Sequence, residues 1–226
     1  MALEDFTTYT AGGAQIADVT VAANQLTCQL TEQDQAWVYD DKGAGHFTNA
    51  FEHHFITRAT SYAINAYSAA NWGVSNTPAE AYQAQIDNTR EAVFLGWSGG
   101  DVQRLREPED ADWDDSIGLS EDTQYYIKVV RSGATGNTVT AYIYTGSIGG
   151  VLVDTIAIAL TDNDQTYRYV YGMNARDEAA GTNETQYYNV YDLDLNEGAP
   201  PAGAVGLLLK ETELGNSLFG GLIHVA

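Results

Sequence analysis

Groups that bind protons and metal ions gather in the stretch AGHFTNAFEHHF, residues 44–55. His46, His53 and His54 lie within it, and Glu52 precedes the adjacent histidine pair. Zinc accepts imidazole and carboxylate ligands, but a structural zinc site usually needs several more ligands, commonly thiolates. Read as a strand, FEHHF places His53 on one face and Glu52 and His54 on the other, because successive side chains alternate. We therefore expect a strand with one inward, hydrogen-bonded imidazole in place of a metal site.

A second group that could bind an ion is the acidic run EPEDADWDDSIGLSE, residues 107–121. Asp110, Asp112 and Asp114 are spaced like the first ligands of a calcium-binding loop. Such a loop has glycine at its sixth position, where this sequence has Asp115. Two interpretations stay open: a solvated acidic hairpin tip, and a calcium site that uses some of the three carboxylates.

Two tryptophans lie in segments that have the composition of loops, Trp72 in AANWGVSN and Trp113 in the acidic run. Exposed aromatic rings stack on the faces of sugars when polar donors and acceptors lie beside them. Both tryptophans are therefore candidate glycan contacts. The alternative is that they are core residues or members of cross-strand aromatic pairs, as most aromatic residues in a sheet protein are.

Motifs for catalysis are missing from the sequence. It contains no Gly-x-Ser-x-Gly, no cysteine–histidine nucleophile pattern and no phosphate-binding loop. Glycosidases use two carboxylates that flank the scissile bond. The nearest arrangement is YDLDL, in which Asp192 and Asp194 share one face, but aspartates at the end of a domain are more typical of turns. We predict that the chain is not an enzyme and has no catalytic residue.

Short strand patterns separated by Gly, Asn and Asp turns fill most of the chain before residue 198. The expected strands cover residues 6–10, 15–30, 36–40, 44–55, 61–69, 91–97, 124–131, 138–144, 151–160, 167–173 and 187–195. One short helix is expected over 77–87. This pattern predicts an all-β, antiparallel β-sandwich. The single cysteine, Cys28, falls on the apolar face of LTCQL and is expected in the core.

The charge disfavours one class of partner. Ten basic residues stand against 31 acidic ones, giving a formal net charge of −21. Such a chain repels the phosphate backbone, so nucleic-acid binding is not expected. The start of the chain lacks the pattern of a signal peptide, and no apolar run is long enough to cross a bilayer. We expect a soluble chain that folds without disulfides.

The order of the segments resembles concanavalin A-like and laminin-G-like jelly-roll modules of the kind found in phage structural proteins. The opening runs from FTTYT through VTVAANQLT to AWVYDDKGAGHFTNAFEHHF. The middle is TQYYIKVVRSGATGNTVTAYIYTGSIGGVLVDTIAIAL, and the last strand is YYNVYDLDL. The resemblance implies a concanavalin A-like jelly roll over residues 1–197. It also favours calcium at a rim loop, since laminin-G-like modules often bind calcium there.

The composition changes after GAPPAG, residues 198–203. The remaining segment is rich in apolar residues, namely Leu207, Leu208, Leu209, Leu214, Leu218, Phe219, Leu222, Ile223 and Val225. Such a segment would expose apolar surface if it were left free. We therefore expect residues 198–226 to be a linker and an extended apolar C-terminal arm, which packs on a partner, on a second copy or on its own domain.

Three hypotheses for function follow. The first is a virion structural protein, such as a capsid decoration, head-fibre or tail-associated protein, that folds in the host cytoplasm and displays a lectin-like module on the virion surface. Residues 198–226 would bind other virion proteins or copies of the chain, and cell-surface glycans are a further expected partner. The second is a free, extracellular lectin module with calcium at the acidic run; in neither hypothesis is a cofactor required. The third, a glycoside hydrolase, lacks the expected carboxylate strand.

Overall fold

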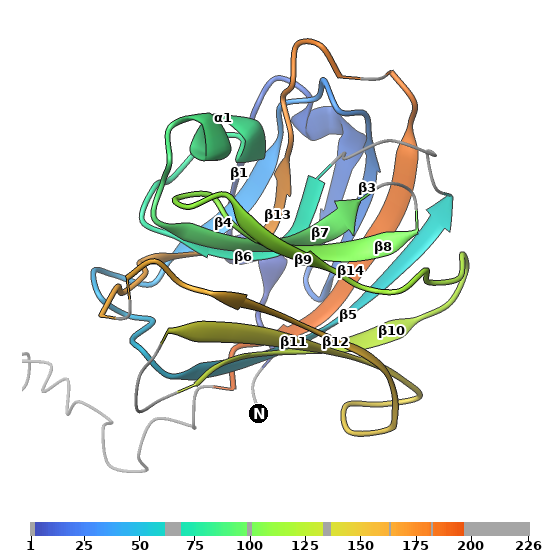
Figure 1. Cartoon of the computed structure of the whole chain (residues 1–226). Helices are drawn as coiled ribbons and strands as arrows, with labels where there is room; N and C mark the ends of the chain where they lie inside the picture. The colour runs from blue at the N-terminus through green and yellow to red at the C-terminus, as the bar shows by residue number, and fades with distance from the viewer. Residues whose placement is uncertain are drawn as a thin grey trace, which may run out of the picture.

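The computed structural model describes residues 3–61, 69–98, 101–132, 137–162, 164–181 and 183–196. These residues form two seven-stranded sheets that pack face to face, with one short helix outside them (Figure 1). Each strand pairs with its neighbours in the antiparallel sense within this described part. The predicted all-β antiparallel sandwich is confirmed. The arm predicted over residues 198–226 lies outside the described residues.

The chain crosses repeatedly between the two sheets. Sheet A has the strand order β1-β4-β13-β6-β7-β8-β9, and sheet B has the order β12-β11-β10-β5-β14-β3-β2. The strands of sheet A are β1 (Thr10–Gly12), β4 (Trp37–Asp41), β6 (Ala69–Ser75), β7 (Ala92–Ser98), β8 (Val102–Glu107), β9 (Asp112–Asp115) and β13 (Tyr169–Ala175). The strands of sheet B are β2 (Val19–Ala22), β3 (Gln25–Leu30), β5 (Phe51–Ser61), β10 (Tyr125–Arg131), β11 (Thr138–Thr145), β12 (Val151–Ala159) and β14 (Gln186–Asp194). The helical elements are η1 (Phe6–Thr8), η2 (Ile16–Asp18) and α1 (Tyr82–Asp87).

The two sheets differ in how much of their outer surface is covered. Every residue of β6, β7 and β13 is buried, because the outer face of sheet A carries a second apolar cluster beneath α1. In that cluster the ring of Tyr82 on α1 packs edge-on against Phe94, with 5.1 Å between ring centroids. In sheet B, β5, β10 and β11 instead alternate buried and half-buried residues. Within the described part of the chain, the outer face of sheet B is therefore a broad sheet surface in contact with solvent.

The helix expected over residues 77–87 forms, but it is shorter than expected. It begins only at Tyr82, because Ala79 has a φ of 51° and so interrupts the helical backbone. Among the described residues, no helix has the length and apolarity that a membrane crossing requires.

Cys28 lies in the main core, as predicted. Its side chain is 1% exposed, and burial raises the pKa of its thiol to about 12. The thiol is therefore neutral at physiological pH, as expected for a small apolar core residue.

His53 is the predicted inward imidazole. Its side chain is 1% exposed, and the indole nitrogen Nε1 of Trp72 donates to its Nδ1 over 3.2 Å. The ring also stacks on Phe51 at a centroid distance of 4.6 Å. Glu52 and His54 lie on the other face of β5, where their side chains are 2.8 Å apart. The alternation predicted from FEHHF is confirmed.

Burial lowers the pKa of His53 to about 3, so the ring is neutral in the folded protein. An unfolded histidine takes up a proton near pH 6.5. The folded state therefore binds fewer protons than the unfolded state between these two values, and stability must fall as the pH is lowered.

We predict that His53→Gln reduces this acid sensitivity. The wild-type protein should lose about 2 kcal/mol more unfolding free energy than the variant between about pH 7 and pH 5. Urea unfolding at the two pH values measures the difference. His46→Gln, at an exposed position, is the matched control for the substitution. Equal pH dependence in the wild type and His53→Gln would contradict the prediction.

Candidate functional site

Trp72 does not lie in a loop. It belongs to β6 in the middle of sheet A, and its side chain is fully buried between the sheets. Its indole N–H is already donated to His53. The prediction that Trp72 contacts a glycan is therefore wrong, because the small residues Ala69, Ala70 and Gly73 that suggested a loop belong to a central strand.

Trp113 lies on β9 and is 52% exposed. The guanidinium groups of Arg104 and Arg106 lie 5.6 and 5.8 Å from its ring. Such cation–aromatic contacts hold the indole against the sheet, although about half of its surface stays exposed. A glycan contact at Trp113 stays a prediction.

The acidic run forms a β-hairpin, with Asp110 in the turn between β8 and β9 and with Asp112 and Asp114 on β9. The Oδ2 atom of Asp114 accepts the backbone N–H of Ala157 at 2.9 Å. No cluster of three or more His, Cys, Asp or Glu side chains suited to a metal ion occurs in the described part of the chain. The three aspartates therefore do not converge, and calcium binding stays a prediction.

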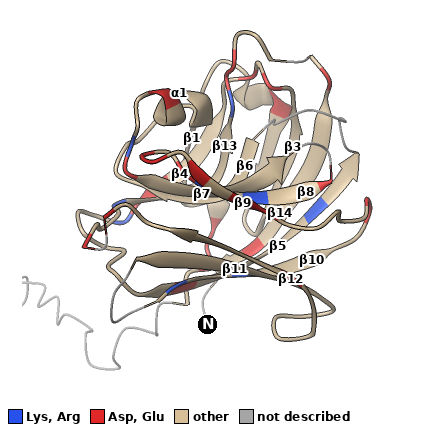
Figure 2. Ribbon diagram, in the orientation of Figure 1, with Lys and Arg blue, Asp and Glu red and all other residues tan. Residues whose placement is uncertain are grey.

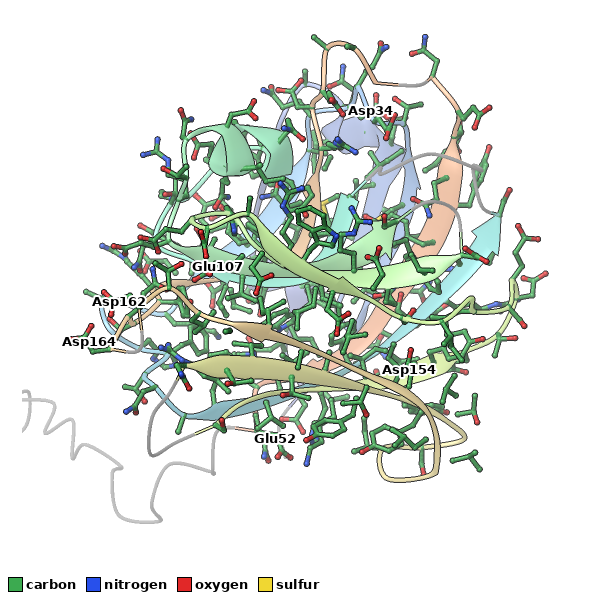
Figure 3. The ribbon with its side chains drawn as sticks, viewed as in Figure 1. Asp34, Glu52, Glu107, Asp154, Asp162 and Asp164 are labelled. Atoms are coloured by element: carbon green, nitrogen blue, oxygen red, sulfur yellow. The ribbon has the colours of Figure 1, made fainter. Side chains whose placement is uncertain are left out.

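Carboxylates at this edge instead connect the two sheets. Besides Asp114, Asp154 on β12 accepts the backbone N–H of Ile117 at 2.7 Å. Glu107 accepts the backbone N–H and the hydroxyl of Thr161 at 3.0 and 3.1 Å. Figure 3 shows Asp154 where β9 and β12 approach each other. These bonds cap backbone groups at the edges of the sheets, which would otherwise lack partners.

The two aspartates of YDLDL each accept a hydrogen bond from a nearby asparagine. Asp192 has a φ of 50° and accepts the side-chain amide of Asn24. Asp194 is 6% exposed and accepts the backbone N–H of Asn196 at 2.8 Å. A register shift between Tyr191 and Asp194 separates their environments.

The outer face of sheet B carries a row of side chains that crosses five strands. Direct cross-strand pairs join Tyr144, Tyr126, Ile56, Tyr191 and Gln25, which lie on β11, β10, β5, β14 and β3 in turn. All five side chains are half-buried. Directly paired residues point to the same face of an antiparallel sheet. With strands about 4.8 Å apart, this tyrosine row extends over roughly 19 Å.

A polar depression lies beside the tyrosine row. Its volume is about 200 Å³, and its lining is Ala17, Asp18, Thr20, Thr27, Cys28, Gln29, Thr60, Tyr187, Tyr188 and Asn189. Tyr187 is 41% exposed at this site. The side-chain oxygen Oδ1 of Asn189 accepts from the Thr27 hydroxyl at 2.9 Å and from the Gln25 side-chain amide at 3.3 Å. These bonds fix the Asn189 amide and leave its nitrogen as a donor.

Ion pairs also lie on the outer face of sheet B. The Lys128 ammonium lies 2.9 Å from the Glu52 carboxylate, and the same carboxylate contacts His54. Partial burial by itself raises the pKa of Glu52, but Lys128 and His54 outweigh it and lower that pKa. Further along β5, the Arg58 guanidinium lies 2.8 Å from the Asp122 carboxylate. Figure 3 shows Glu52 on the outer side of sheet B, pointing away from sheet A.

This face combines flat aromatic rings with amide, hydroxyl and carboxylate groups. Such a combination suits a ligand that has apolar ring faces and many hydroxyl groups. Tyr126, Tyr187, Tyr191 and Asn189 are not among the site residues predicted from the sequence. The alternation in YYNVY, residues 187–191, already places Tyr187, Asn189 and Tyr191 on one face. It could not show which strands lie next to β14.

Comparisons with known proteins identify the fold. No protein-family model matches the chain, and no curated protein matches it. Several solved structures do. The Emp47p carbohydrate recognition domain has a TM-score of 0.54 and 10% identity over 84% of this chain and 92% of that chain. The described residues have the concanavalin A-like jelly-roll fold.

Other solved structures place lectins and enzymes on this same fold. Lectin UEA-II complexed with galactose has a TM-score of 0.53 and 8% identity over 83% of this chain and 91% of that chain. An alginate lyase mutant in complex with an alginate trisaccharide also has a TM-score of 0.53, with 15% identity over 84% of this chain and 87% of that chain. The chain spans only 18% of the length of a sialidase that it also matches. At these identities the likeness concerns the fold alone, and the prediction that the chain is not an enzyme stays a prediction.

Calcium binding has a direct test. If Asp110, Asp112 and Asp114 hold the ion, millimolar calcium should raise the melting temperature of the wild-type protein, because ligands that bind only the folded state stabilise it. The shift should disappear in Asp112→Asn, while Asp5→Asn, a matched loss of charge at the N-cap of η1, should keep it. Since Asp114 already accepts a backbone N–H, we expect little or no shift. A clear shift that is lost in Asp112→Asn would establish the calcium site.

Proposed function

We propose that the chain is a carbohydrate-binding module that holds its ligand on the outer face of sheet B. The observation that carries the proposal is the tyrosine row beside the polar depression, on a broad sheet face that the other described residues leave open. The fold neighbours add support, since they include a carbohydrate recognition domain and a lectin complexed with galactose.

The chemistry of the face fits a sugar chain. Aromatic side chains bury the apolar faces of sugar rings, and the row presents Tyr144, Tyr126 and Tyr191 at intervals across the sheet. Asn189 and the threonine hydroxyls of the depression supply hydrogen bonds to hydroxyl groups. A roughly 19 Å row is long enough for several linked sugar rings.

We predict that Tyr191→Ala lowers the affinity for the cognate oligosaccharide roughly ten-fold, which equals about 1.4 kcal/mol of lost contact. Titration calorimetry with a panel of oligosaccharides measures the loss. Tyr191→Phe keeps the ring and should retain most of the affinity.

Trp113→Ala separates this face from the site predicted from the sequence. If Trp113 is the contact, its substitution should lower the affinity and Tyr191→Ala should not. The opposite result supports the sheet B face. The same panel, assayed for product formation, shows whether the ligand is also cleaved, as a glycoside hydrolase or a lyase would do.

A second proposal concerns the setting in which the module works. The apolar residues after position 203 favour attachment of the module through residues 198–226. We propose that the chain is displayed on a virion surface, docked onto other virion proteins or onto copies of itself, with glycan binding as its outward function. A free extracellular lectin is the alternative, and it fits the fold equally well.

Removal of residues 198–226 should abolish assembly and leave the β-domain folded. Light scattering coupled to size-exclusion chromatography should show an oligomer for the full chain and a monomer for the shortened one. Far-UV circular dichroism checks that the sheets are retained. A shortened chain that still assembles would contradict attachment through this segment, and a monomeric full chain would favour the free lectin.

A further inference from the structure

The basic groups on the outer face of sheet B are all engaged with carboxylates. Three basic residues occur on the strands of this sheet, namely Arg58, Lys128 and Arg131. Arg131 points inward and is 1% exposed. The other two reach the outer face, where Glu52 lies 2.9 Å from Lys128 and Asp122 lies 2.8 Å from Arg58.

The polar depression likewise offers no positive charge to an acidic ligand. Among its described lining residues, Asp18 is the one charged side chain, and it is acidic. An acidic sugar that entered the depression would therefore bring its carboxylate close to another carboxylate, with no cation in the lining to compensate. At longer range the formal net charge of −21 repels anionic ligands further. Figure 2 shows acidic positions over many loops and strand ends and few basic positions.

We infer that the ligand of this face is an uncharged carbohydrate, and that Glu52 and Asp122 exclude acidic carbohydrates by neutralising Lys128 and Arg58. This inference rests on the proposed carbohydrate-binding function. An acidic sugar at Lys128 would either displace Glu52 or share the ammonium with it, and in both cases two carboxylates would lie close together. The exchange gains no net ion pair, and specificity arises from the repulsion that remains.

The two pairs differ in strength. Glu52 and Lys128 are 33% and 28% exposed, whereas Asp122 and Arg58 are 66% and 40% exposed. Glu52 also contacts His54, so it is held by two neighbours. Exposed ion pairs are weaker than partly buried ones, and water screens them more. Glu52 is therefore the stronger barrier to an acidic ligand.

The test compares neutral and acidic oligosaccharides on the full chain and its variants. The neutral probes are cello-, xylo- and manno-oligosaccharides, and the acidic probes are oligoalginate and oligogalacturonate. We expect the wild type to bind a neutral probe with little dependence on salt and to bind the acidic probes at least ten-fold more weakly. Glu52→Gln should then improve binding of an acidic probe roughly ten-fold, because the freed Lys128 can form a charge-assisted hydrogen bond.

Asp122→Asn should produce a smaller gain in the same direction. Asp41→Asn is the matched control, since it frees Arg168 from a similar pair at β4 of sheet A. It should not change binding of the acidic probes. Adding Lys128→Met to Glu52→Gln should remove the gain in binding of the acidic probe. That result would show that Glu52→Gln acts through Lys128.

The outcomes separate this inference from the proposed function. A wild type that binds acidic probes more tightly than neutral ones overturns the inference and keeps the carbohydrate-binding function. Failure of Glu52→Gln and Asp122→Asn to gain acidic binding also overturns it, even when the wild type binds neutral probes. A wild type that binds no carbohydrate of either kind overturns the proposed function and the inference with it.

Discussion

The pairing register of β5 is the constraint on which the core and the candidate site both depend. β5 lies between β10 and β14 at the centre of sheet B, where Ile56 pairs directly with Tyr126 and Tyr191. Because side chains alternate along a strand, a slip of one residue would exchange its two faces. His53 would then point to solvent, and Glu52 would enter the apolar core.

That register is fixed from both sides of the strand. Toward the core, His53 accepts the indole N–H of Trp72, and Thr57 accepts N–H groups of Trp97 and Asn71. Toward solvent, Glu52 contacts Lys128 across the β5–β10 pair. Buried polar groups need partners with specific positions, so these bonds discriminate against a slipped register more strongly than apolar contacts alone would. The same register of β5 aligns Ile56 with Tyr126 and Tyr191, and so forms the tyrosine row.

The excess of acidic residues has structural uses that composition alone does not reveal. At the β9–β12 edge, Asp114, Asp154 and Glu107 accept the backbone N–H groups of Ala157, Ile117 and Thr161, which lie on or just beyond β9 and β12. On the outer face of sheet B, Glu52 and Asp122 neutralise the basic side chains. Acidic residues therefore both close the open edge of the sandwich and set the charge of its exposed face. The spacing of Asp112 and Asp114 follows from strand alternation, since alternate residues of β9 share one face, and Asp110 lies in the preceding turn.

The sequence by itself determined the features that depend on local periodicity. Alternation predicted the antiparallel sandwich, the inward His53 and the buried Cys28, because the two-residue repeat of a strand is visible within a few residues. Tertiary structure decided the features that depend on which strands are neighbours. Trp72 is buried because β6 is a central strand between β13 and β7, although its small neighbours have the composition of a loop. The tyrosine row joins Gln25 to Tyr191 and Ile56 to Tyr126, residues that are far apart in the chain. No local pattern encodes those pairings, because they arise from pairing, within sheet B, of strands that are far apart in the chain.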